Sequence, residues 1–577
     1  MQTFIESEDF INLFNSPGNT VEIADMVVTE DIGFTKVNYN CEYAILNNIK
    51  FEGSITFDNI DIGKGIKFQN CSFQDLLVIS NIKAAGKHGL PIDTFYNLTF
   101  DNCSVPRLIL PQSNFLEYGM VIRGECKIGG IIIQNLSASY NGINIENSSL
   151  TDKLQFSNIK LNDGSIRLKS SKINCRIKIE NLNAFDIVFI ENEIKRDIFI
   201  WGGKCKSGII FNDGIFSDDV TITSVKANGI LTVTGSDFKK ILKMELDDVA
   251  SGTKGNIGEV FISDVKFGNG FILNGFKKEI QKVLINASPN LTGTIKFENC
   301  LFIEANLNGD NHKGNIIFIS CQFKRIEFNH FVNYGNILLS SCKAISSSDS
   351  EFNINFSNLG KTQFFNFFFD SFDKVNILDS HFSEITTTGV TWFKNNVLNI
   401  SNESNSDAGR KKMDIFRQLK QASEKQGDKI QALEFQAFEL KAFKQHVNLK
   451  ESFWSNDRMI LWLSQTNNFG INWWKPLLLV VGITFLFYIL IAIDIAPNLH
   501  WRLSFIQSDI KGTLGVIFID KAYIFPQLFN PARAIDRMLD KAEVNLSAFL
   551  YFLDALHRII LTFFIVQIVS TFRKFIK

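Results

Sequence analysis

The sequence has little of what enzymes and nucleic-acid-binding proteins use. It carries only nine Pro and seven His in 577 residues, and GxSxG, HExxH and glycine-rich phosphate-binding motifs are absent. The formal net charge is −1 and no strong Lys/Arg run occurs, whereas a nucleic-acid-binding protein needs a basic footprint. We therefore expect no catalytic residues, no cofactor, no enzymatic activity and no nucleic-acid partner.

Cysteine is present but lacks metal-binding spacing. No two of the nine cysteines form a CxxC pair, so we expect no metal site. The first 14 residues lack the basic stretch and long apolar run of a signal peptide. We expect reduced, buried thiols that act as small apolar side chains in a cytosolic domain. The cysteines are Cys41, Cys71, Cys103, Cys126, Cys175, Cys205, Cys300, Cys321 and Cys342.

Phenylalanine is abundant, with 56 Phe against 9 Tyr and 7 Trp, and it recurs in a degenerate repeat. In each copy, alternating apolar and polar residues lead to Asn or Ser, and then to Cys or another small residue. Cys300, Cys321 and Cys342 lie 21 residues apart, and Asn59 and Asn70 lie 11 apart. Copies include FQNCSF (68–73), TFDNCSV (99–105), IKFENCLF (295–302) and IFISCQF (317–323).

These spacings predict a solenoid with irregular coils of about 20–24 residues. Each coil carries short strands with apolar residues inside, and Asn, Ser and Gly turn the corners because they tolerate special backbone conformations. The scarcity of Pro fits, since Pro would break ladder hydrogen bonds. We predict a mainly β fold, a right-handed parallel β-helix over residues 1–400, with roughly 18 coils and a length on the order of 85 Å.

The alternatives are a propeller and a tandem of β-sandwiches. A propeller repeat of about 40–50 residues fits the 11- and 21-residue recurrences less well. We expect an inserted coil or side loop within residues 226–294 and another loop at residues 84–93. The pairs Asp218-Asp219 and Asp247-Asp248 point to opposite faces of a strand, so we interpret them as solvated turn residues and not as a polysaccharide-cleaving site.

The periodicity changes to helical after the polar residues 401–412. Apolar residues at 413, 416 and 419, and again at 430, 433 and 437, flank a Gln-Gly-Asp turn at 426–428, which predicts an α-helical hairpin. Residues 453–463, with Trp462, are apolar at near-helical spacing. They predict either a helix in a membrane interface or one packed under the solenoid. We assign residues 401–472 to the hairpin and this interfacial linker.

Two stretches, residues 475–493 and 547–572, are long and apolar enough to cross a bilayer, which needs roughly 20 residues. We therefore predict a transmembrane domain at residues 473–577 with two spans and an extracytoplasmic loop. In this loop, residues 512–519 are too short to span and predict a strand or a re-entrant segment. Residues 529–543 predict an amphipathic helix.

The segment FRQLKQASEKQGDKIQALEFQAFELKAFKQ with ILWLSQTNNFGINWWKPLLL resembles part of bacterial pentapeptide-repeat-type membrane proteins, as does the ending LDALHRIILTFFIVQIVSTFRKFIK. The resemblance covers residues 410–577 and the general solenoid layout. It implies a bacterial inner-membrane protein in which a helical hairpin joins a β-solenoid to two C-terminal spans. The family supplies no catalytic residues.

Basic residues flank both spans on one side, which places the N-terminal domain and the C-terminus in the cytoplasm of a multi-pass protein. We expect the membrane-interface anchors to be Trp462, Trp473, Trp474, Lys475, Arg573 and Lys574.

Polar residues inside the second span are the best functional lead, because charges at bilayer depth are costly and face protein or water. Asp554 and Arg558 are four residues apart and can pair on one helix face. His557 is adjacent to Arg558, and Gln567 lies further along. They are candidates for holding helices together, for lining a pore or gate, or for relaying protons.

Two functions follow from these features. The first is a non-enzymatic recognition or scaffold protein that binds the lipid bilayer and, through its solenoid or spans, a protein partner or itself. The second is an oligomeric pore-forming or membrane-perturbing effector in stress or phage defence, with the solenoid as sensor. A carbohydrate-active β-helix is a third reading, and it requires the solenoid to lie outside the cell.

Overall fold

The structure is a computed structural model. It describes residues 3–14, 20–35, 43–84, 96–111, 114–248, 253–346, 349–394, 396–400, 405–450, 455–495, 512, 514–533, 535 and 547–572. The chain divides into two compact units, Met1–Asn399 and Ile400–Lys577.

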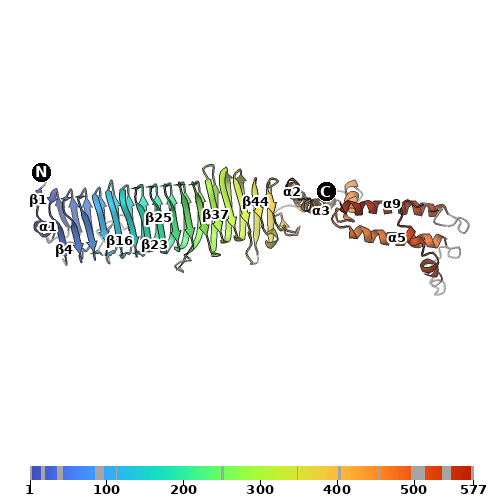
Figure 1. Cartoon of the computed structure of the whole chain (residues 1–577), viewed down its shortest axis with the longest axis horizontal. Helices are drawn as coiled ribbons and strands as arrows, with labels where there is room; N and C mark the ends of the chain where they lie inside the picture. Colours follow the sequence, from blue (N-terminus) through green and yellow to red (C-terminus); the bar gives the residue numbers. More distant parts are fainter. Residues whose placement is uncertain are drawn as a thin grey trace. The chain divides into compact units, whose positions relative to one another are not determined.

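The first unit is a parallel β-solenoid of about 16 turns, which confirms the predicted fold class and excludes a propeller (Figure 1). It runs from β1 (Thr3–Ile5) to β47 (Leu398–Asn399). Each strand pairs in parallel with the equivalent strand one turn later: β18 (Gly142–Glu146) pairs with β21 (Ser165–Lys169), and β21 with β23 (Arg176–Ile190). Backbone hydrogen bonds therefore run along the solenoid axis.

The number of turns is lower than the roughly 18 expected from a uniform coil. Side chains of most neighbouring turns bond across 21 to 23 residues, as in the Asn181–Asn158 and Ser171–Asn192 pairs. Some turns are longer. Leu98 is the register partner of Ile66, 32 residues earlier in the chain, and Val260 is that of Leu231, 29 residues earlier.

The interior is built of stacked ladders of apolar side chains. Strands such as β5 (Tyr43–Asn47) alternate buried and half-buried residues. Phe rings stack from turn to turn, with centroids 5.0 Å apart for Phe68–Phe100 and for Phe189–Phe211. At the N-terminal end, α1 (Ser7–Phe14) places Phe10 against Phe34 and Phe51. This helix covers rings that the first turns would otherwise expose, as solenoid ends require.

Asparagine adopts the left-handed backbone conformation at many corners of the solenoid, as predicted from the sequence. Asn158 and Asn181 have φ of 56° and 52°, in the left-handed region. Their side-chain amides form a ladder in which each Nδ2 donates to the preceding Oδ1, at 3.3 Å to Asn135 and 3.2 Å to Asn158. The left-handed corners with Asn are 48, 59, 70, 81, 102, 135, 141, 147, 158, 181, 299 and 366.

The eight cysteines within the described residues are buried and free, as predicted, and Cys41 lies outside the described residues. The thiols of Cys71, Cys103, Cys126, Cys300, Cys321 and Cys342 donate to backbone carbonyls, as Cys71 Sγ does to Leu46 O at 3.2 Å. Burial raises the pKa of Cys175 to about 11 and that of Cys205 to about 12. These thiols are therefore protonated and unreactive near neutral pH.

The solenoid is interrupted within residues 226–294, where irregularity was expected. There β31 (Asp247–Asp248) and β32 (Thr253–Lys254) form a small antiparallel ribbon, and Lys278 bonds to Asp247. Asp218 pairs with Lys240 at 2.6 Å. The loop predicted at residues 84–93 begins at the end of β11 (Lys83–Ala84), and the rest lies outside the described residues.

The second unit begins with the predicted helical hairpin, α2 (Asn405–Lys425) and α3 (Lys429–Lys450). Phe416 packs against Phe438 with centroids 5.3 Å apart, and Arg417 donates to Glu439 at 2.9 Å. The turn is left-handed at Gly427, with φ of 77°.

Helices α4 (Asn456–Gln465), α5 (Trp474–Ile495) and α9 (Ala548–Phe572) follow. The described residues between α5 and α9 include the π-helix η3 (Val516–Asp520) and the short helix α7 (Ile524–Gln527). Helices α5 and α9 match the two predicted spans. Residues 514–520 are helical, so the predicted strand alternative for 512–519 is wrong; a helix satisfies its backbone groups internally, which a lone strand cannot do. The described part of the predicted helix at 529–543 forms turns at 529–533.

Candidate functional site

Helices α5 and α9 pack along each other and leave apolar surfaces facing outward. Val480 contacts Leu561 and Phe564, and Leu550 belongs to a second buried cluster with Tyr488 and residues of the intervening segment. In their most apolar stretches only 39% and 33% of the residues are buried. Both helices are long and apolar enough to cross a membrane. The outward side chains include Leu478, Leu479, Val481, Leu486, Phe552, Ile559, Val566 and Val569.

Asp554, one of the predicted polar residues, is buried between these helices and pairs with two arginines. Its Oδ2 accepts from Arg558 Nη2 at 2.5 Å, the predicted pairing one helical turn apart. Its Oδ1 accepts from Arg533 Nη2 at 2.6 Å. Both carboxylate oxygens are therefore used, which offsets the cost of burying the charge.

Arg533 comes from the segment that joins the two helices and is 7% exposed. Its Nη1 donates to Leu528 O at 2.7 Å and to Asn530 O at 3.2 Å. Its Nη2 also lies 3.1 Å from His557 Nδ1. The guanidinium thereby ties its own turn to α9.

His557 is completely buried and joins α9 to α5. Its Nε2 lies 3.2 Å from Thr484 Oγ1, and its ring lies 5.0 Å from the ring of Phe487. Because a guanidinium can only donate, Nδ1 must accept from Arg533 and the proton must sit on Nε2, which donates to Thr484. The geometry therefore requires the neutral imidazole. We call Thr484, Arg533, Asp554, His557 and Arg558 the polar network.

The polar network lies halfway along the helix pair. Thr484 is ten residues from the start of α5, about 15 Å along the axis of a helix about 33 Å long. The joining segment reaches the same level, since Phe525 packs against Phe485 at 6.0 Å between centroids and Tyr488 donates to Ile517 O. Residues 514–533 thus return along α5 in the manner of a re-entrant segment, shielded by protein on one side.

Gln567 does not belong to the polar network. Gln567 Oε1 accepts a hydrogen bond from Asn467 Nδ2 at 2.5 Å. Asn467 Nδ2 also donates to Ser570 Oγ at 3.2 Å. Asn467 lies in the loop between α4 and α5, so Gln567 fixes this loop to the end of α9. At the opposite end, Ser547 Oγ donates to Asp494 at 2.8 Å.

Of the predicted interface anchors, four lie within the described residues. Trp462 of α4 is 65% exposed, and Trp473, Trp474 and Lys475 stand at the start of α5. Trp473 also contacts Phe572 at the end of α9, with centroids 6.0 Å apart. Within its unit, helix α4 buries Leu461 and leaves Met459, Ile460 and Trp462 exposed. Arg573 and Lys574 lie outside the described residues.

Sequence reasoning missed Arg533 and Thr484. Nothing in the sequence distinguishes Arg533 from the other basic residues between the spans, and Thr484 is one polar residue in an apolar run. Among the residues that the structure describes, no group of His, Cys, Asp and Glu is arranged to hold a metal ion.

Comparison of the chain with models of protein families, with curated proteins and with solved structures finds no significant match. The structure thus supports the solenoid and the two candidate spans, while no family match supports pentapeptide-repeat identity. Turns of 21 to 23 residues are also not whole multiples of five.

Proposed function

We propose that this protein is a non-enzymatic recognition or scaffold protein of the bacterial inner membrane. Helices α5 and α9 anchor it as a multi-pass protein, and the solenoid presents a long repetitive surface in the cytoplasm to a protein partner. The observation that carries the proposal is the outward apolar surface of α5 and α9. Leu486, Phe552 and Ile559 are 55%, 61% and 69% exposed, and a surface of this kind marks a membrane or protein interface.

Charge placement supports the proposed orientation. Lys475 stands at the start of α5, and Arg573 and Lys574 follow α9 in sequence. Basic residues at span ends favour the cytoplasmic side. Both chain ends then lie in the cytoplasm, and residues between the spans face the opposite side.

Protease treatment of membrane vesicles tests the proposed orientation. In inverted inner-membrane vesicles, added protease should remove the solenoid and leave a protected C-terminal fragment that contains α5 and α9. In intact spheroplasts the solenoid should survive. Digestion of the solenoid in spheroplasts would place it outside the cell and would favour the carbohydrate-active reading instead.

A second candidate function is an oligomeric pore or membrane-perturbing effector in stress or phage defence. The polar network favours it, because it places three charged side chains halfway along the candidate spans. Two spans cannot enclose a pore, so this function requires several copies. Conductance in planar bilayers that Asp554→Ala alters would support it. A monomer in detergent with no conductance would contradict it.

A further inference from the structure

One corner of the solenoid carries a row of eight outward side chains, four of which are lysine and none of which is acidic. Asp61 precedes this row in the register, and its carboxylate lies 3.9 Å from Lys83 Nζ. The row follows the parallel register from turn to turn. We call it the lysine row, and it consists of Lys83, Phe115, Ser137, Lys160, Asn183, Lys204, Lys226 and Asn256. Its four lysines are exposed. From Lys83 to Lys226 it spans six steps, about 30 Å at about 4.8 Å per step.

A groove follows the lysine row. One hollow of about 650 Å³ is lined by Trp201, Lys204 and Lys226, and another of about 700 Å³ by Lys83 and Phe115. The two hollows adjoin, because both are lined by Asn158 and Lys160, and we call them together the groove. None of their lining residues is acidic.

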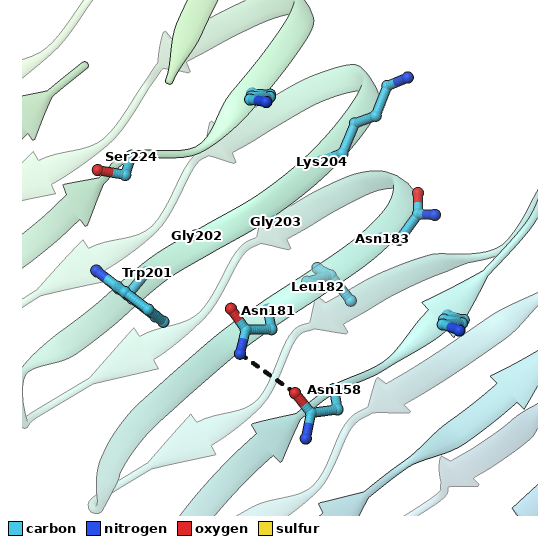
Figure 2. A pocket seen from close by; sticks show the side chains of 11 residues that line it. Asn158, Asn181, Leu182, Asn183, Trp201, Gly202, Gly203, Lys204 and Ser224 are labelled. Carbon is cyan, nitrogen blue, oxygen red and sulfur yellow. Dashed lines mark hydrogen bonds between the residues drawn. The ribbon is translucent and has the colours of Figure 1, made fainter. Parts of the chain in front are cut away.

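Trp201 and Lys204 lie on one strand of this groove with Gly202 and Gly203 between them (Figure 2). Gly203 has φ of 92°, and a Cβ there would lie 2.1 Å from Leu182 O, so only glycine fits. The glycine pair leaves the floor open beside the partly exposed indole. Trp is the residue type most often found at the centre of binding surfaces.

Rows of the solenoid differ in charge. A row through Arg107, Gly130, Lys153 and Arg176 is also basic, but its two arginines pair with Asp152 and Asp197. Another row carries both signs, and it runs through Lys127, Ser149, Lys172, Glu193, Ile215, Asp237 and Lys266. Two carboxylates close to the lysine row form ion pairs with lysines outside the row: Glu180 pairs with Lys178, and Asp163 pairs with Lys206. Within the described part of the chain, Lys160, Lys204 and Lys226 have no ion pair.

We propose that this groove binds an extended acidic segment of a partner protein. Lys160 and Lys204 lie two turns apart, about 10 Å. This matches carboxylates three residues apart on a peptide in the extended polyproline II conformation, which has three residues per turn and advances about 3.1 Å per residue, so that every third side chain faces the same side. The amide ladder of Asn135, Asn158 and Asn181 offers both donors and acceptors, as a peptide backbone does.

A nucleic-acid strand fits the groove less well. A strand of duplex DNA carries one charge per about 3.4 Å, far more than four lysines over about 30 Å neutralise. Its phosphodiester backbone only accepts hydrogen bonds, whereas a peptide backbone both donates and accepts, as the Asn side chains of the groove do. The proposal rests on the proposed recognition function and names the chemistry of the partner.

Peptide binding to the full-length protein in detergent tests the groove. The probe is a dye-labelled peptide of about 12 residues, with Glu at every third position, Ser and Thr between, and one Phe; it spans about 40 Å when extended. Fluorescence anisotropy should show binding that weakens as salt rises. The variant Lys160→Gln/Lys204→Gln/Lys226→Gln should raise Kd about tenfold, since exposed charge pairs contribute modestly and add up.

The control variant is Lys127→Gln/Lys172→Gln/Lys266→Gln, which removes the same charge from the row that carries both signs and should change Kd less than about twofold. Circular dichroism checks that both variants are folded. Three results would overturn the proposal: no binding of the Glu peptide, equal weakening in both variants, or tighter groove-dependent binding of heparin or poly(U). Each of these results would exclude the acidic peptide as the ligand of this groove. None of them would contradict the proposal that the protein is a membrane-anchored recognition protein, so the two proposals can be tested separately.

Discussion

At the scale of single residues, corner positions were the most predictable part of the chain. Copies of the repeat place Asn or Ser before a small residue, and the structure gives these residues a left-handed backbone, as at Asn299 with φ of 52° and Ser320 with φ of 54°. Asn tolerates this conformation better than other non-glycine residues. The requirement is local, so it could be recognised without knowing the partners in space.

Replacing Asn299 by Val should therefore destabilise the solenoid by about 1–2 kcal/mol, because a β-branched residue is strained at positive φ. Asn299→Gly should cost far less. Asn315→Val, on a regular strand, is the matched control and should stay within about 0.5 kcal/mol. Thermal unfolding followed by circular dichroism measures the differences. Equal effects of Val at both positions would contradict a left-handed corner.

The buried thiols should resist modification. In a Cys41→Ser background, the remaining eight cysteines should not react with Ellman's reagent at pH 8 in the folded protein, and all should react after denaturation. Burial raises the pKa of Cys175 and Cys205 above the unfolded value near 9. This contribution to stability is complete below pH 9 and is lost as the pH rises through about 11 to 12. Rapid labelling of a native thiol would contradict the buried assignment.

At the scale of elements, the sequence predicts the turn of the helical hairpin and both apolar helices within a few residues, because each has a periodicity or a length that stands alone. Helix α2 begins at Asn405, within the polar stretch 401–412 that was expected to precede it. It does not predict the polar network. Asp554 and Arg558 are recognisable as a pair one helical turn apart, whereas Arg533 and Thr484 reach them only through the folding of the joining segment. Such contacts depend on tertiary packing, which leaves no local pattern.

The polar network should hold this unit together. Arg533→Ala removes the buried arginine that pairs with Asp554 Oδ1 and leaves His557 Nδ1 without a donor, so it should destabilise the helix pair by about 3–5 kcal/mol. The double variant Arg533→Ala/Asp554→Ala should lose less than the sum of the two single variants. Lys521→Ala, in the same segment, is the control. Thermal stability in detergent is the measurement, and an Arg533→Ala protein as stable as the control would remove the network's structural role.

At the scale of the whole molecule, the repeat predicts the architecture but not its regularity. An average coil length gives roughly 18 turns, and the structure has about 16, because insertions lengthen turns without adding new ones. The sequence also hides the lysine row. Its members lie a full turn apart along the chain, so a chain with net charge −1 gathers like charges only once the coils are stacked.

The central claim is that a β-solenoid protein is held in a bilayer by α5 and α9. Washing isolated membranes with alkaline carbonate tests it most directly, since this treatment strips peripheral proteins and leaves lipid-embedded helices in place. The full-length protein should stay in the membrane pellet and enter solution only with detergent. Its release into the carbonate supernatant would mean that the outward apolar surfaces of α5 and α9 are covered by protein and not by lipid.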